Sequence, residues 1–134
     1  MKKIVISLDF DVTLLGSKDN KALNFYNKYK DKFEFIILTR RYDDYHVHLW
    51  EANPSNKDLY KYLEENNLDK SKVFFQNFEY KYKWLKDSIV VVHIDDDSYE
   101  IDLINTNTNT YAISCFHENL EEAILNYIEH GTIL

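Results

Sequence analysis

The sequence contains little cysteine, proline or glycine, and it lacks a long hydrophobic run. Its 134 residues include one cysteine, one proline and two glycines, with no internal repeat or low-complexity linker. Because Cys115 has no second cysteine to pair with, an internal disulfide and a cysteine-based metal site are excluded. The first apolar run is interrupted by Asp9 and Asp11, so it is too short and too acidic for a signal or membrane segment. We therefore expect a cytoplasmic protein that does not associate with membranes.

Basic side chains are outnumbered as well. The chain has 16 lysines and arginines against 23 acidic residues, which gives a net charge of -7 and a pI near 5.1. An acidic surface repels polyphosphate chains, which disfavours non-specific coating of nucleic acid but not contact with one terminal nucleotide. Hydrophobic residues make up 45% and aromatic residues 16%, enough to build a core and to exclude intrinsic disorder. At this length we expect one domain spanning residues 1–134.

Apolar runs of strand length alternate with longer segments in which apolar residues recur at helical spacing. The expected strands are Ile4 to Leu8, Phe33 to Leu38, Val73 to Phe75, Ile89 to Ile94 and Tyr111 to Ser114. The expected helices are Asn20 to Lys30, Lys57 to Asn66, Tyr80 to Lys86, Ser98 to Asn105 and Leu120 to His130. Near-continuous apolar strands are typical of a sheet covered on both faces. The order predicts an α/β fold, a three-layer Rossmann-like sandwich around a five-stranded, mainly parallel sheet.

Acidic residues follow two of these expected strands. Asp9 and Asp11 lie where the first apolar run ends, and Asp95, Asp96 and Asp97 come directly after the fourth. In an open parallel sheet, ligands bind at the carboxyl ends of strands, and carboxylates placed so close together need a cation, a shared proton or wide solvent exposure. An acidic turn and a capped helix are the alternative explanations. The grouping favours a site for a hard, oxygen-binding cation.

A hydroxyl and several basic residues complete the pattern. Thr39 closes the second expected strand and is followed by Arg40 and Arg41. A hydroxyl beside backbone N–H groups at this height suits a phosphate oxygen. Lys81 and Lys83 lie in or beside the short helix before the fourth strand, where a point charge steadies a transferring phosphoryl group. Spacing alone does not choose between these two lysines, and a solvated surface position is the alternative for each.

In combination these residues resemble the four motifs of the haloacid dehalogenase (HAD) phosphatase superfamily. Asp9 with Asp11 matches the first motif, Thr39 the second, Lys81 the third, and Asp95 with Asp96 the acidic fourth. Val12 stands where that superfamily most often has glycine. Receiver domains also combine acids, a threonine and a lysine, but they differ in the order of these residues along the chain.

The resemblance implies a magnesium-dependent phosphomonoester hydrolase. Asp9 would form an aspartyl-phosphate, and Asp11 would act as general acid and base. Thr39 and Lys81 would hold the phosphoryl oxygens. Magnesium would be held by Asp9, the backbone carbonyl of Asp11, Asp95 and Asp96.

The intervals between the motifs leave no room for a cap domain. In layout the chain is similar to the 3′-phosphatase domains of phage-type polynucleotide kinases, which implies a nucleotide or a polynucleotide 3′-phosphate end as substrate. The segment from Arg40 to Asn56 has no clear periodicity and is a candidate substrate loop. Within it, Arg40 and Arg41 could bind a second phosphate and Trp50 could stack on a base.

Two alternatives to that substrate stay open. One is a nucleotidase for free deoxynucleotides or other small phosphates, and the other is a non-catalytic protein of the same fold that binds phosphate or a partner. Every motif position is filled, which disfavours the non-catalytic alternative. No obligate protein partner is evident from the sequence.

Overall fold

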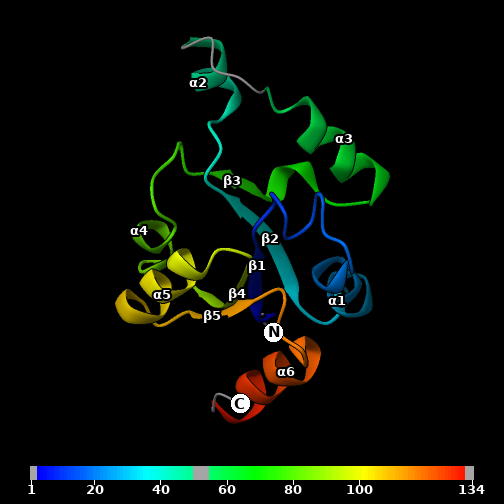
Figure 1. Cartoon of the computed structure of the whole chain (residues 1–134), viewed down its shortest axis with the longest axis vertical. Helices are drawn as coiled ribbons and strands as arrows, with labels where there is room; N and C mark the ends of the chain where they lie inside the picture. The colour runs from blue at the N-terminus through cyan, green and yellow to red at the C-terminus, as the bar shows by residue number, and fades with distance from the viewer. Residues whose placement is uncertain (1–2, 50–54, 132–134) are drawn as a thin grey trace.

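All five expected strands are present in the computed structural model, which describes residues 3–49 and 55–131. The strands are β1 (Val5–Leu8), β2 (Glu34–Thr39), β3 (Val73–Phe75), β4 (Val90–Asp95) and β5 (Tyr111–Ser114). They form one sheet in the order β3-β2-β1-β4-β5, and each neighbouring pair is parallel (Figure 1). The predicted α/β class is therefore confirmed, with a sheet that is wholly parallel over the described residues.

Helices follow the strands along the chain. They are α1 (Lys21–Tyr29), α2 (Asp44–Leu49), α3 (Lys57–Glu65), α4 (Tyr82–Leu85), α5 (Ser98–Asn107) and α6 (Leu120–His130), with a short 3₁₀ turn at Lys70–Lys72. Five coincide with the expected helices apart from a few terminal residues. The exception is α2, which lies within the segment expected to be a loop. Within the described ranges, no helix combines the length and the apolar character that crossing a membrane requires.

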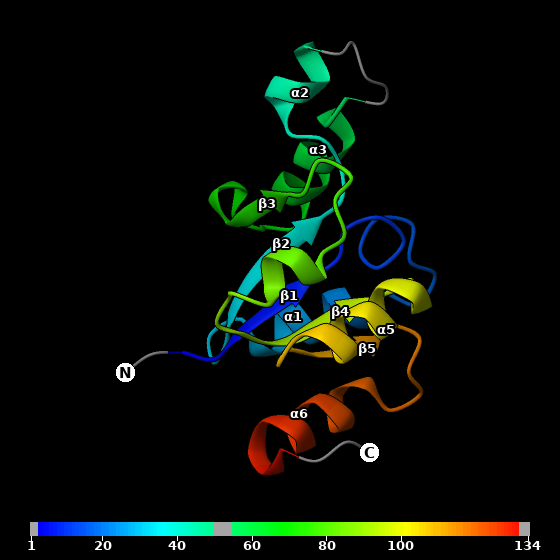
Figure 2. The same ribbon diagram turned by 90° about the vertical axis from the view of Figure 1, so that its left-hand side faces the viewer.

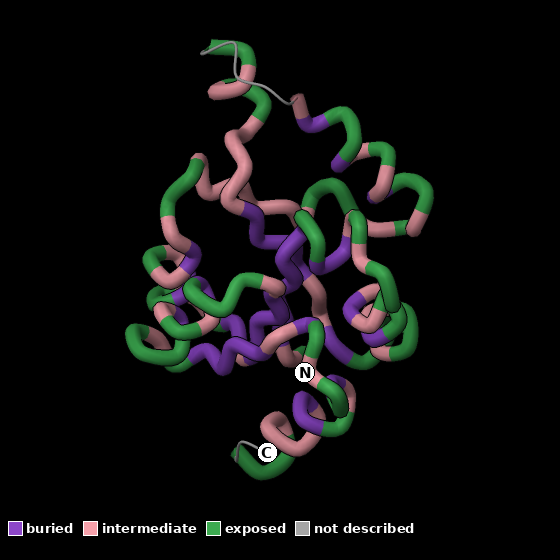
Figure 3. The backbone as a smooth tube through the Cα atoms, in the orientation of Figure 1, coloured by how far each residue is buried: buried purple, intermediate pink, exposed green. Residues whose placement is uncertain are grey.

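The helices cover both faces of the sheet, as a three-layer sandwich requires (Figure 2). Buried residues of α1, α3 and α6 pack against Ile6 and Leu8 of β1 on one face. Leu85 of α4 and Ile104 of α5 pack against Val5 of β1 on the other. The buried backbone accordingly concentrates along the central strands in Figure 3. Because both faces are covered, β1 is buried along its whole length.

Strand β1 lies at the centre of the sheet, between β2 and β4. Its Leu8 is paired with Ile37 on one side and with Ile94 on the other. The backbone N–H of Asp9 donates to the carbonyl of Ile94 at 2.9 Å, which extends this alignment one residue past the strand. The side chains that follow β1, β2 and β4 therefore meet at one edge of the sheet. This is the point where the strand order reverses direction, the usual position of ligand sites in such sheets.

Candidate active site

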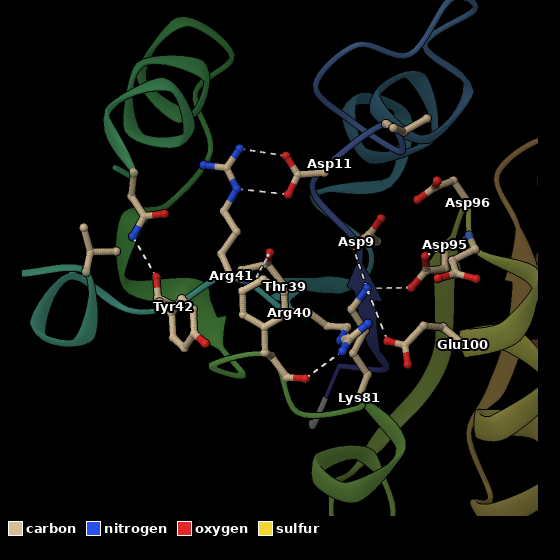
Figure 4. Close-up of a pocket in the computed structure, with 15 residues that line it drawn as sticks. Asp9, Asp11, Thr39, Arg40, Arg41, Tyr42, Lys81, Asp95, Asp96 and Glu100 are labelled. Atoms are coloured by element: carbon tan, nitrogen blue, oxygen red, sulfur yellow. Dashed lines mark hydrogen bonds and ion pairs between the residues drawn. The ribbon is translucent and has the colours of Figure 1, made fainter. Parts of the chain in front are cut away.

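A pocket of about 440 Å³ opens at this edge of the sheet (Figure 4). Asp9 comes directly after β1, while Thr39 and Asp95 are the last residues of β2 and β4. All three side chains line the pocket and are almost completely buried. The remaining lining residues are Asp11, Val12, Arg40, Arg41, Tyr42, Val47, Asn56, Phe78, Lys81, Asp96, Asp97 and Glu100. Apart from the alternative lysine Lys83, the structure thus brings together the sequence-predicted site residues that it describes.

Lys81 joins the two buried carboxylates at the bottom of the pocket. Its Nζ lies 2.6 Å from Asp9 Oδ1 and 2.6 Å from Asp95 Oδ2, and the side chain is only 3% exposed. Glu100 of α5 lies 3.9 Å from the same nitrogen. Lys83, by contrast, is exposed and bound to Glu79 on the surface. Of the two candidate lysines, Lys81 is therefore the one that reaches the pocket.

Asp96 adds a third carboxylate to this group. The Thr13 hydroxyl lies 3.0 Å from Asp9 Oδ2 and 3.4 Å from Asp96 Oδ1. One oxygen from each of Asp9, Asp95 and Asp96 lies within 4.8 Å of the other two. Lys81 pairs with two of these three carboxylates, so the group carries a negative surplus. Closely spaced carboxylate oxygens with surplus charge fit a hard divalent cation such as Mg²⁺.

Burial and charge act on these groups in opposite directions. Burial raises the pKa of Asp9 well above its ordinary value; the charge of Lys81 opposes this increase, and the nearby carboxylate of Asp95 adds to it. Burial opposes ionisation of Asp95 too, but there the hydrogen bond from His93 and the charge of Lys81 prevail and hold its pKa below the ordinary range. Burial likewise opposes the charge of Lys81, yet the two carboxylates keep its pKa above the ordinary value. Lys81 is therefore charged and pairs with two carboxyl groups, of which Asp95 ionises more readily than Asp9.

Behind Asp95 lies a buried hydrogen-bond chain that the sequence did not indicate. The ring of His93 on β4 is fully buried, with Nε2 at 2.7 Å from Asp95 Oδ2 and Nδ1 at 2.6 Å from Ser7 Oγ on β1. Burial lowers the pKa of His93, which favours the neutral ring. A neutral ring that donates to Asp95 accepts from Ser7. These hydrogen bonds, together with that from Lys81, fix the position of Asp95 Oδ2.

Arg41 binds Asp11 instead of standing open to solvent. Its guanidinium donates to both Asp11 oxygens, at 2.9 and 2.7 Å (Figure 4). It also donates to both Asp58 oxygens, at 2.8 and 2.9 Å. These hydrogen bonds, Asp58 before Asp11, raise the pKa of Arg41 although burial opposes them. The Asp11 carboxylate is 51% exposed and does not belong to the group of three described above. Whether its backbone carbonyl binds a metal stays a prediction.

The other predicted substrate contacts differ in position. Arg40 lies against the ring of Tyr80, with its guanidinium carbon 4.7 Å from the ring centroid, and donates to the carbonyl of Phe78 at 2.7 Å. Unlike Arg41, it pairs with no acid among the described residues, and its Nε is buried without a hydrogen-bond partner. Trp50 lies outside the described residues. Val47 of α2 lines the pocket, and Asn56 fastens the base of the α2 segment by donating to the carbonyl of Tyr42 at 2.9 Å.

Two pocket residues have an unusual backbone. Val12 and Phe78 adopt positive φ angles of 70° and 69°. A side chain in this left-handed region strains the backbone by roughly 1–2 kcal/mol, and for branched or bulky residues it is rare. Both side chains are largely exposed, at 45% and 58%. Neither strain is therefore offset by burial in the core.

Searches of family models, of curated protein sequences and of solved structures found no significant match for this chain. The resemblance to the HAD superfamily consequently depends on the residues of the pocket alone.

Proposed function

We propose that this chain is a magnesium-dependent phosphomonoester hydrolase of the HAD type, acting in the cytoplasm through a phosphorylated Asp9. The observation that carries the proposal is the buried negative surplus at the end of β1. Asp9, Asp95 and Asp96 lie close together, and Lys81 pairs with two of the three. Such an arrangement weakens the apo fold, because buried carboxylates repel and lose hydration. Perturbed acids gathered in a cleft are typical of catalytic sites.

The pocket residues suit a two-step transfer. In the first step a carboxylate oxygen of Asp9 attacks phosphorus, the bond to the leaving oxygen breaks, and Asp11 donates a proton to that oxygen. In the second step water attacks the aspartyl-phosphate, Asp11 accepts a proton from the water, and the bond to Asp9 breaks to release inorganic phosphate. The exposed Asp11, held at the pocket rim by Arg41, is suited to exchange protons with the leaving group and with water.

The remaining polar groups orient the phosphoryl group. Thr39 lines the pocket at the end of β2, and Lys81 lies against Asp9, so a hydroxyl and an ammonium would be available to the phosphoryl oxygens. Asp9, Asp95 and Asp96 would hold Mg²⁺, together with the backbone carbonyl of Asp11. When bound, the ion would supply positive charge that screens these carboxylates from the incoming phosphate.

Among the open substrate classes, the pocket favours a small phosphomonoester. Six acidic and three basic residues line it. An acidic rim repels the further phosphates of a polynucleotide, so we place the 3′-phosphate end second.

The test is hydrolysis of p-nitrophenyl phosphate with and without Mg²⁺, comparing the wild type with Asp9→Asn. We expect Mg²⁺-dependent turnover that Asp9→Asn lowers by at least ~10³-fold, because the amide cannot form the aspartyl-phosphate. Asp31→Asn is the matched control, since Asp31 is exposed and precedes β2 at the opposite edge of the sheet. A folded, Mg²⁺-loaded wild type that hydrolyses neither aryl nor nucleotide phosphates would contradict the proposal.

A further inference from the structure

The strained residues Val12 and Phe78 lie in different loops that line the same pocket. Val12 belongs to the turn after β1, and Phe78 to the connection between β3 and α4. Elsewhere in the described ranges the left-handed backbone is adopted by residues that tolerate it. These are Asn20, Asn67, Asn77, Gly16 and Gly131. Asparagine and glycine relieve this strain, whereas a β-branched or aromatic residue does not.

The side chains of these two residues contribute little to the core. Phe78 is 58% exposed and Val12 is 45% exposed, although most apolar side chains of this size would be buried. The Phe78 ring stands 4.7 Å from the ring of Tyr42, measured between centroids, at an interplanar angle of 53°. The apolar residues that line the pocket are Val12, Tyr42, Val47 and Phe78, and we call these four the apolar wall.

The charged groups of the pocket limit what else can bind beside this wall. Lys81 is bound to Asp9 and Asp95, and Arg41 is bound to Asp11 and Asp58. Arg40 donates to a backbone carbonyl and packs on Tyr80. Arg40 is thus the one pocket-lining cation that no described acid pairs with, and its Nε is buried without a hydrogen-bond partner. Six acidic residues line the pocket against three cations, so a second anionic group on a substrate would still meet net repulsion there.

We infer that the site takes phosphomonoesters whose leaving group carries a flat, uncharged ring, which packs on Phe78 and Val12 while the phosphate enters beside Asp9. The inference rests on the proposed phosphatase function and narrows its substrate class to aryl or nucleoside monophosphates. A pocket of about 440 Å³ is large enough for one ring system beside a phosphate. Aromatic contacts of this kind add selectivity beyond the area they bury.

The test compares benzyl phosphate, cyclohexylmethyl phosphate and 4-carboxybenzyl phosphate. The first two release alcohols of similar basicity, so they differ mainly in the flatness of the ring, and the third adds an anionic group. We expect kcat/KM for benzyl phosphate to exceed the other two by roughly fivefold to tenfold. Phe78→Gly and Val12→Gly should remove most of this preference and raise the melting temperature, because each relieves a strained backbone. Phe78→Leu should keep part of the preference for benzyl over carboxybenzyl phosphate.

Ile89→Ala is the matched control, because Ile89 is 74% exposed and precedes β4 at the other edge of the sheet. It should leave all three rates unchanged. Equal rates on benzyl and cyclohexylmethyl phosphate, or a preference that survives Phe78→Gly, would overturn the inference. So would faster hydrolysis of a 3′-phosphorylated oligonucleotide than of a nucleoside monophosphate.

A binding measurement separates this inference from the proposed function. Calorimetry with benzylphosphonate and cyclohexylmethylphosphonate in Mg²⁺ does not need turnover. Preferential binding of benzylphosphonate without hydrolysis of any ester would refute the phosphatase proposal but support the ring-binding wall. Turnover of all esters without any ring preference in rate or binding would refute the wall and leave the phosphatase proposal in place.

Discussion

Replacing Lys81 by methionine should reveal the charge surplus of the pocket directly. Methionine keeps most of the apolar stem, so the main change is the loss of an ammonium that lies 2.6 Å from both Asp9 and Asp95. Removing one partner of a buried ion pair destabilises a protein by about 3–5 kcal/mol, because the remaining charge has no compensation. Since a domain of this size has a total stability of about 5–15 kcal/mol, Lys81→Met should be strongly destabilised and partly unfolded in mild urea.

Two further measurements make this prediction specific to charge. The double variant Asp9→Asn with Lys81→Met should be more stable than Lys81→Met alone, because it removes one of the uncompensated carboxylates, with a coupling of about 0.5–3 kcal/mol. Mg²⁺ at 100 times its Kd should raise the stability of the folded state by about 2.7 kcal/mol through preferential binding.

The assay is urea denaturation followed by circular dichroism, with and without Mg²⁺. Lys83→Met is the matched control, because Lys83 is 52% exposed and pairs with Glu79 on the surface, and it should change stability by less than ~0.5 kcal/mol. A loss below ~1 kcal/mol for Lys81→Met, or a double variant no more stable than the single one, would refute the reasoning.

Three other predictions concern groups around the site. The hydrogen bond from Arg41 lowers the pKa of Asp58 despite partial burial, so its stabilisation is complete above an unfolded pKa near 4 and is lost as the pH falls through the lower folded value. Carboxyl NMR titration should show an Asp58 midpoint below 3.8 in the wild type and a return toward 3.8 in Arg41→Gln. Because Asp58 is 46% exposed, the accompanying change in stability should be under ~1 kcal/mol. An Asp58 midpoint that is the same in both proteins would contradict the pairing. In urea denaturation, His93→Asn should lower the free energy of unfolding by about 1–3 kcal/mol, because the shorter asparagine side chain cannot reach Asp95. His93→Gln should lower it by less. Equal losses in the two variants would show that the hydrogen bond is unimportant. Burial raises the pKa of the Cys115 thiol to about 11, so iodoacetamide at pH 8 should modify this thiol only after the protein unfolds. Mass spectrometry measures the labelling. Rapid labelling of the native protein would disprove the burial of Cys115.

The sequence predicted the sheet well because its strands are buried on both faces. Val90 to Ile94 and Phe35 to Leu38 are near-continuous apolar runs, which a polar loop or a half-exposed strand would not contain. The site acids were found for a related reason. Asp9, Thr39 and Asp95 come where apolar runs stop, and the carboxyl ends of parallel strands necessarily meet.

The missed features depend on contacts between distant parts of the chain. Helix α2 buries none of its described side chains, so it lacks the apolar stripe by which helices are predicted. Arg41 carries the same charge whether it binds a substrate phosphate or Asp11 and Asp58, and only the tertiary structure identifies its partners. The sequence pattern did not single out Phe78, because its unusual features are a positive φ angle and an exposed ring, and neither leaves a periodic pattern of apolar residues.

The Ser7–His93 hydrogen bond has a consequence for the order of folding. It joins residues 86 positions apart, on neighbouring strands of the sheet. Contacts between such distant positions form slowly, because a long loop must close before they contribute. Asp9 and Asp95 therefore meet only when β4 docks beside β1. If the docking of β4 follows the rate-limiting step of folding, a cation bound between Asp9 and Asp95 will slow unfolding and leave the folding rate almost unchanged. The cation would then lengthen the lifetime of the native state without speeding its formation.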